Sequence, residues 1–157
     1  MNTDKKIKFI VTAAVIAALY AALTLVLAPI SYGQVQFRIS EILTVLPYFT
    51  PAAIPGLFVG CILGNIYSPM GFIDIAFGSL ATLIAACLTR FMPKKWLVPL
   101  PPVIINGIIV GVELRLIYNL PLVPSMLYVA LGEAVVCYVG GIPFLLALDK
   151  LGGRLFK

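Results

Sequence analysis

Six ionisable side chains of this 157-residue sequence stand apart from its basic clusters, in or beside hydrophobic segments. They are Arg38, Glu41, Asp74, Glu113, Arg115 and Glu133. A lone charge buried in hydrocarbon costs at least about 2.5 kcal/mol, so such residues usually pair with one another or bind a ligand. We therefore treat these residues first as candidates for a polar binding site.

Catalytic and metal chemistry have little support in the sequence. It contains no histidine, which removes His-based triads, His metal ligands and the usual general base. Its three cysteines, Cys61, Cys87 and Cys137, lie singly in apolar runs, so neither a disulfide framework nor a metal site is indicated. Without a Walker motif or another Gly-rich phosphate loop, the chain cannot itself use ATP. We predict a protein that is not an enzyme and has no catalytic residue, metal or cofactor.

The composition is typical of an integral membrane protein. Hydrophobic residues make up 62% of the sequence and charged residues 11%, and the mean hydropathy is +1.11. The net charge of +5 does not indicate nucleic acid, because most basic residues lie in three short juxtamembrane clusters. These clusters are Lys5, Lys6 and Lys8, then Arg90, Lys94 and Lys95, and finally Lys150, Arg154 and Lys157. The expected surroundings are a lipid bilayer.

Cytoplasmic loops are enriched in Lys and Arg, so all three clusters are expected on the cytoplasmic side. An even number of crossings must then separate each cluster from the next. We predict an all-α polytopic protein with six transmembrane helices, both termini in the cytoplasm, and one membrane domain over residues 1–157. The expected helices are 9–28, 38–49, 52–67, 72–91, 98–118 and 125–148. The first is retained as a helix because no small-residue cleavage site of a signal peptide follows it.

The second and third predicted helices are unusually short. They are separated because Pro47, Pro51 and Pro55 crowd together and interrupt helical hydrogen bonding. Each piece of about 15 residues would be about 22 Å long, which is short for a bilayer span. Shortened elements of this kind often mark the binding site of a transporter.

With this topology, all six charged side chains fall in the outer half of the bilayer, which predicts a polar cup open to the outside. Local alternatives remain open for several of them. Arg38 and Glu41 are three residues apart and could pair with each other, and Asp74 could interact with the amides of a helix N-terminus. Glu113 and Arg115 point to different faces of one helix. Glu133 lies deepest and has no local basic partner, so it is the leading candidate for a ligand contact.

The predicted substrate-binding set includes polar and aromatic neighbours of these charges. Its members are Glu133, Glu41, Arg38, Gln36, Glu113, Asp74, Tyr32 and Asn65. Tyr32 is one of four tyrosines, with Tyr67, Tyr118 and Tyr128, that are expected near the outer rim. Such tyrosines are compatible with stacking on a flat ligand, but they also suit an ordinary interfacial belt.

Small residues recur at four-residue spacing in the first helix and form two parallel ridges. One ridge consists of Ala13, Ala17 and Ala21, and the other of Ala14, Ala18 and Ala22. The third helix has the same four-residue spacing of small residues, at Gly56, Gly60 and Gly64. Such ridges let a second helix approach closely. The sequence leaves open whether the alanine ridges pack inside the chain or dock a second membrane protein.

The stretch YGQVQFRISEILTVLPYFTPAAIPG, residues 32–56, resembles the signature of the QueT family of queuosine-precursor transporters. This family is similar to the substrate-binding S components of energy-coupling factor transporters. The likeness is sharpest over residues 32–67 and continues in the helix pattern of the rest. Ile42 stands where the pattern has a small residue after the glutamate, which bears on packing more than on the cup.

The resemblance implies six helices, a substrate site near the extracellular side, and a first helix whose alanine ridges contact a transmembrane coupling subunit that carries two ATPase subunits. It also implies a deazaguanine ligand. A guanine-like edge presents adjacent N–H donors, which a carboxylate such as Glu133 or Glu41 accepts side by side. Asp74 or Glu113 would meet an aminomethyl cation on the base.

The resulting hypothesis is an S component in the plasma membrane of a prokaryote. It would capture a queuosine precursor from outside for ATP-driven uptake by its partner subunits. The alternative is a self-sufficient carrier of a small nitrogenous base or vitamin, driven by protons or sodium, in which Glu113 and Glu133 carry the ion.

Overall fold

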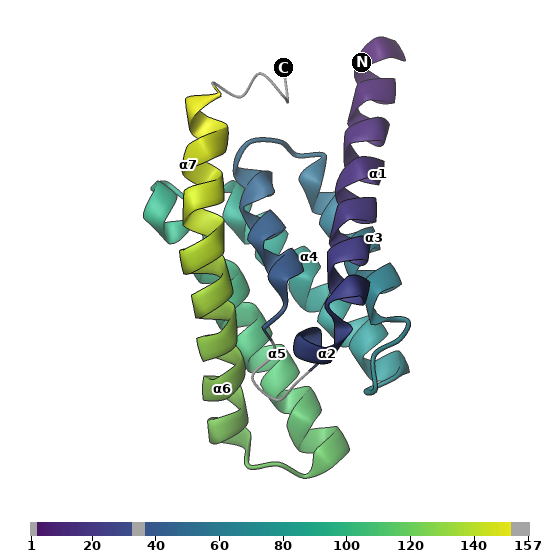
Figure 1. Ribbon diagram of the computed structural model, residues 1–157, viewed down its shortest axis with the longest axis vertical. Helices are drawn as coiled ribbons and strands as arrows, with labels where there is room; N and C mark the ends of the chain where they lie inside the picture. Colours follow the sequence, from purple (N-terminus) through teal and green to yellow (C-terminus); the bar gives the residue numbers. More distant parts are fainter. Residues whose placement is uncertain (1–2, 33–36, 152–157) are drawn as a thin grey trace.

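The computed structural model describes residues 3–32 and 37–151, and every regular element within these residues is helical (Figure 1). The first half contains α1 (Thr3–Val26), α2 (Ala28–Ser31), η1 (Ile39–Tyr48) and α3 (Ala53–Asn65). The second half contains η2 (Asp74–Gly78), α4 (Ser79–Arg90), η3 (Lys95–Leu97), α5 (Leu100–Tyr118), α6 (Leu122–Ala134), η4 (Val135–Gly141) and α7 (Ile142–Lys150). The prediction of an all-helical protein is therefore confirmed for these residues.

Three helical stretches are long and apolar enough to cross a membrane. They are Thr3–Val26, Lys95–Tyr118 and Leu122–Lys150, the last being one continuous rod of α6, η4 and α7. Shorter apolar helices cover Ile39–Tyr48 and Ala53–Asn65. The chain is thus a helical membrane protein by length and composition. The count of six crossings and the orientation of the termini stay predictions.

The element η1 differs from the α-helix that the sequence suggested for residues 38–49. It is a 3-10 helix of 10 residues with Pro47 inside it, and it follows Arg38, whose backbone is extended. Runs of 3-10 helix beyond three or four residues are uncommon, and the rise of about 2.0 Å per residue makes them longer than an α-helix of the same residue count. Most of η1 is buried, so a stretched, narrow helix passes through the interior.

Glycines of α3 let α1 and α3 approach closely along the small-residue ridges. A Cβ atom added at Gly56 would lie 2.8 Å from the Ala13 carbonyl oxygen, and one at Gly60 would lie 2.8 Å from the Ala17 carbonyl oxygen. Ala17 and Ala21 are accordingly buried. The ridge of Ala13, Ala17 and Ala21 therefore packs inside the chain against α3.

A second close approach joins η1 to the π-helical segment η4. A Cβ atom at Gly140 would lie 2.5 Å from Cδ1 of Ile42. The missing side chain of Gly140 thus makes the room in which the large Ile42 side chain packs. Ile42, the large residue after Glu41, therefore fits because Gly140, far from it in the sequence, has no side chain.

Contacts at one end of the bundle bring the basic clusters together. The Arg90 guanidinium donates hydrogen bonds to the carbonyl oxygens of Pro47, at 3.2 Å, and Tyr48, at 2.9 Å. Lys95 forms an ion pair of 2.6 Å with Asp149 near the end of α7. Figure 1 shows the start of α1 at the same end of the molecule as the end of α7.

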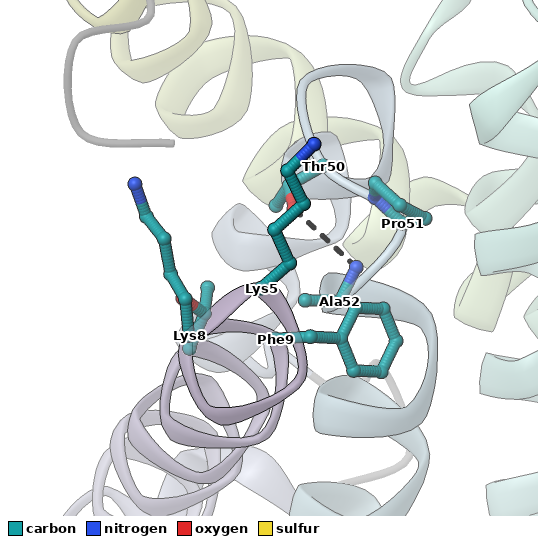
Figure 2. A pocket seen from close by; sticks show the side chains of 7 residues that line it. Lys5, Lys8, Phe9, Thr50, Pro51 and Ala52 are labelled. Atoms are coloured by element: carbon teal, nitrogen blue, oxygen red, sulfur yellow. Dashed lines mark hydrogen bonds between the residues drawn. The ribbon is translucent and has the colours of Figure 1, made fainter. Parts of the chain in front are cut away.

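The first basic cluster borders a pocket at this end. Figure 2 shows Lys5 and Lys8 projecting from α1 beside the turn of residues 50–52, where the Ala52 amide donates to Thr50 Oγ1 at 3.3 Å. The pocket has a volume of about 290 Å³. Described members of all three clusters therefore lie at one end of the molecule, which we name the basic end. Arg154 and Lys157 lie outside the described residues.

We predict that Gly60→Ala destabilises the protein by about 1–3 kcal/mol, because the new methyl group must push against the α1 backbone. Thermal unfolding of the purified protein in detergent measures this. Leu63→Ala on the same helix is the matched control, since Leu63 is 43% exposed. Equal melting temperatures for Gly60→Ala and wild type would show that the close approach of α1 and α3 is wrong.

Candidate functional site

An ion pair between Arg38 and Asp74 lies in the interior. Arg38 Nη2 is 3.8 Å from Asp74 Oδ2, and the two side chains are 4% and 0% exposed. Arg38 Nη1 also contacts the Cys61 sulfur at 3.8 Å. The pair joins the residue that precedes η1 to the first residue of η2. Arg38 therefore forms its ion pair with a distant residue rather than with Glu41, the local alternative.

Glu41 is held by a residue of α1. The Tyr20 hydroxyl donates a hydrogen bond to Glu41 Oε1, and both side chains are almost completely buried. The other carboxylate oxygen, Oε2, has no hydrogen-bond partner among the described residues. One residue earlier in η1, Ser40 Oγ lies 2.7 Å from Thr24 Oγ1, so α1 contacts η1 through two polar side chains, Tyr20 and Thr24.

Asp74 and Asn65 form a second polar contact, between η2 and the end of α3. Asn65 Nδ2 donates to the Asp74 backbone oxygen at 2.9 Å and to Oδ1 at 3.3 Å. The Asp74 carboxylate therefore interacts with Asn65 and Arg38. Asp74 lies in the first turn of a helical stretch that begins at residue 72, which is the position that the sequence suggested for it.

Glu113 of α5 and Glu133 of α6 complete the group, and each is 2% exposed. The charge of Glu113 interacts with those of Asp74 and Arg38. Glu133 interacts with Glu41 and Asn106, and its Oε2 lies 3.7 Å from the sulfur of Cys137. We name Arg38, Glu41, Asn65, Asp74, Glu113 and Glu133 the polar cluster.

Arg115 lies outside the polar cluster. Its guanidinium is exposed and donates to the carbonyl oxygens of Asn119 and Leu120, both at 3.4 Å. The sequence placed Arg115 with the other five charges by depth. The sequence also indicated that Arg115, two residues from Glu113, points to a different helix face, and its exposed contacts agree with this.

The polar cluster contains many buried atoms without a hydrogen-bond partner in the described structure. They are Arg38 Nε and Nη2, Glu41 Oε2, Asn65 Oδ1, Asp74 Oδ2, and both carboxylate oxygens of Glu113. Buried polar groups in native proteins are hydrogen-bonded in the great majority of cases. This concentration in one place is suited to a ligand that supplies hydrogen-bond donors to the acidic groups and an acceptor to Arg38.

The predicted substrate-binding set also includes Tyr32 and Gln36, which are not members of the polar cluster. Tyr32 donates from its hydroxyl to the Gly64 carbonyl oxygen, and its ring centroid is 5.9 Å from Arg38 Cζ. Tyr32 is thus a neighbour of the polar cluster. Gln36 lies outside the described residues. The remaining rim tyrosines, Tyr67, Tyr118 and Tyr128, are 75%, 47% and 55% exposed, as an interfacial belt requires.

Sequence reasoning missed several residues that support the polar cluster. Tyr20 holds Glu41, while Thr44 Oγ1 lies 3.9 Å from the Cys137 sulfur. Cys61 contacts both Arg38 and Asn65. A usable signal was present for Tyr20, because a tyrosine in the middle of an apolar helix is unusual away from the interfaces. Within the described residues, no group of three potential metal ligands could hold an ion.

The two alanine ridges of α1 have different surroundings. Ala17 and Ala21 are buried against α3, whereas Ala14, Ala18 and Ala22 are exposed. A groove of about 330 Å³ lies between α1 and α3. Its lining residues are Phe9, Ile10, Ala13, Ala14, Ala17, Pro55 and Val59. Of the proposed docking residues, Ala14 and Ala18 are therefore free to meet a partner, and Ala17 and Ala21 pack inside the chain.

The fold and the polar cluster define a helical membrane protein with a buried group of charged side chains. The family model described as QueT transporter matches residues 10–150, and the chain belongs to this family of transporters, which are not enzymes. The protein is 32% identical over 162 residues to the queuosine precursor transporter QueT of Lactococcus lactis subsp. cremoris (strain MG1363), and the match covers 93% of each chain. No solved structure matches the chain.

We predict that Glu113→Leu raises the stability of the ligand-free protein by about 1–3 kcal/mol, because it removes a buried carboxylate whose oxygens have no hydrogen-bond partner among the described residues. The apolar neighbours Ile109 and Val112 would accommodate the leucine side chain. Thermal unfolding without ligand measures the change, with Arg115→Leu as the matched control on the exposed face of α5. A lower melting temperature for Glu113→Leu would mean that the carboxylate has partners in the ligand-free protein.

Proposed function

We propose that the chain is the membrane substrate-binding component of a transporter for a queuosine precursor, a deazaguanine-type base taken up from outside. The observation that carries the proposal is the set of buried, unpartnered donors and acceptors in the polar cluster, drawn from segments far apart in the sequence. The printed name of the Lactococcus relative supports the same substrate class.

The chemistry of the cluster suits the edge of a guanine-like base. Glu41 Oε2 is free to accept a hydrogen bond, while Oε1 is fixed by Tyr20. Arg38 Nε and Nη2 have no hydrogen-bond partner among the described residues, although Nη2 lies 3.8 Å from Asp74 Oδ2, so the guanidinium can donate to a carbonyl oxygen of the base. Glu133 lies next to Glu41 and can accept a second N–H group. A neutral hydrophobic ligand would leave all these groups unpaired.

The proposed topology is six crossings of the plasma membrane of a prokaryote, with both termini in the cytoplasm. The gathering of the basic clusters at one end supports it, because positive residues concentrate on the cytoplasmic side. The 3-10 helix η1 begins beside Arg38 and ends at Tyr48, which contacts Arg90 of the basic end. Its length of about 20 Å separates the polar cluster from that end, so the substrate would enter from outside.

Energy for transport would come from a transmembrane coupling subunit with two ATPase subunits. The exposed residues Ala14 and Ala18 and the groove beside them support docking at this face, because small residues let a partner helix approach closely. The filled protein would be reoriented by the ATPase cycle. Reconstitution of the purified chain with and without these subunits tests the scheme, and ATP-dependent uptake by the chain alone would contradict it.

The second candidate function is a carrier coupled to protons or sodium without partner subunits. The buried carboxylate of Glu113, which has no hydrogen-bond partner among the described residues, is the observation in its favour. This candidate requires uptake by the chain alone that collapses when an ionophore removes the gradient. ATP-dependent uptake that persists with ionophore and needs the partner subunits supports the first function instead.

We predict that deazaguanine bases raise the melting temperature of the purified protein and that Glu41→Gln and Glu133→Gln each lower their affinity by about 10- to 100-fold. The reason is the loss of a charge-assisted acceptor for the N–H groups of the base. A thermal-shift screen against purines and deazapurines gives the first readout, and titration calorimetry gives the affinity. Arg115→Gln should bind like wild type. Unchanged affinity in both glutamate variants would remove them from the site.

We also predict that Ala18→Phe abolishes stable association with the coupling subunit and leaves the affinity for the base unchanged, because the large ring blocks the exposed ridge. Co-purification from membranes that contain all subunits measures association. Leu127→Phe is the matched control, since Leu127 is an exposed residue of α6. Normal co-purification of Ala18→Phe would exclude this ridge as the docking face.

A further inference from the structure

The pocket beside Lys5 and Lys8 at the basic end adjoins an apolar groove. The pocket has a volume of about 290 Å³ (Figure 2), and the groove, of about 350 Å³, is lined by residues of α1, η1 and α7. Thr12 lines both, so the two hollows are neighbours along α1. Apart from Thr12, every residue that lines the groove is apolar, and Leu46 of η1 and Phe144 of α7 are examples. We name it the α7 groove.

One face of α1 connects the pocket to the α7 groove. Residues three and four apart share a face of a helix. On α1 this face consists of Lys5, Lys8, Thr12, Val15 and Leu19. Val15 and Leu19 are 52% and 49% exposed, so the apolar part of the face is open to the surroundings. The face is therefore charged at the basic end and apolar for about 10 Å beyond Thr12, at 1.5 Å rise per residue.

The two lysines at the charged end of this face have no acidic partner. Lys95, another member of the basic end, forms an ion pair with Asp149. Within the described residues, no ion pair joins Lys5 or Lys8 to a carboxylate. Their two positive charges are thus available to an anion from outside the chain.

We propose that the pocket and the α7 groove together bind one anionic phospholipid. Its phosphate lies between the ammonium groups of Lys5 and Lys8, and one acyl chain lies along the α7 groove. Lysine binds phosphate as a compact point charge, and apolar surface is favourably covered by hydrocarbon. A soluble anion would leave the groove empty, and a lipid without net charge would leave one lysine charge unbalanced.

The depth of the site matches that of a lipid headgroup. Trp96, at the basic end beside Lys95, is 60% exposed, as is common for tryptophan at a membrane–water interface. Anionic lipids at such an interface attract basic side chains, and basic pockets between helices bind their headgroups. The site is separate from the polar cluster, so the inference does not depend on the substrate.

The test compares two lipids that differ in headgroup charge. The purified protein, freed of lipid in a neutral detergent, is mixed with equal amounts of phosphatidylglycerol and phosphatidylcholine that carry the same acyl chains. Native mass spectrometry measures how much of each lipid the protein retains. The wild-type protein should retain phosphatidylglycerol at least about fivefold more than phosphatidylcholine. Equal retention would overturn the proposal.

A matched pair of double variants assigns the preference to the pocket. Lys5→Gln with Lys8→Gln should reduce the preference to within about twofold, because both phosphate contacts are lost. Lys6→Gln with Lys94→Gln removes the same charge from exposed positions that do not line the pocket, and it should keep the preference. A preference that survives the first pair, or falls equally in both, would overturn the assignment to Lys5 and Lys8.

Two further measurements test the groove. Val15→Trp places a large ring in the α7 groove at an exposed position, so the variant should melt like wild type without lipid and retain about fivefold less phosphatidylglycerol. Retention equal to wild type would exclude the groove. Glycerol phosphate, which has the anionic group without a chain, should not displace the lipid. Displacement by it at equal concentration would show a site for soluble anions and overturn the lipid assignment.

Discussion

A charged side chain inside an apolar helical protein is stable only when other groups replace the water it has lost. This constraint explains where the segments of the chain meet. Arg38, whose extended backbone precedes η1, pairs with Asp74 at a distance of 3.8 Å, and this ion pair connects the start of η1 to η2. Glu41 relies on Tyr20 of α1. Each contact joins two segments, so the site and the packing of the bundle depend on the same few polar groups.

Three irregular helices, η1, η2 and η4, lie where these polar groups are. Glu41 lies in the 3-10 helix η1, Asp74 begins the π-helical segment η2, and Cys137, the neighbour of Glu133, lies in the π-helical segment η4. Narrow and wide helical turns change which way a side chain points relative to a regular α-helix, and π-helical segments are frequent at functional sites. The Gly140 backbone brings η4 close to Ile42, so the two irregular segments also support each other by packing.

Helix α1 has two roles on two faces. Tyr20 and Thr24 point inward and contact Glu41 and Ser40 of η1. Ala14 and Ala18 point outward and are exposed. In the proposed function, α1 would connect substrate capture with subunit docking, because one face contacts Glu41 and the other exposes small residues. The ridge of Ala17 and Ala21 contributes by letting α3 pack against the same helix.

Much of this arrangement could be predicted from the sequence because charge and hydropathy constrain depth. The positions of Lys5, Arg90 and Lys95 predicted a shared end, and the depth of Glu113 and Glu133 predicted a common polar region. Depth alone placed Arg115 with Glu113, and only their spacing of two residues indicated that the two side chains point to different helix faces. A four-residue repeat likewise does not reveal which alanine ridge faces the interior. The 3-10 form of η1 depends on tertiary contacts such as the Ile42–Gly140 packing, which no local propensity encodes.

The central claim is that the polar cluster is the binding site of the base. An experimental structure of the protein with a bound deazaguanine base tests it most directly. The account predicts the base inside the bundle, within hydrogen-bond distance of the Glu41 and Glu133 carboxylates, with Arg38 donating to its carbonyl oxygen. A base bound at the basic end, in the pocket beside Lys5 and Lys8, with the polar cluster unchanged, would contradict it.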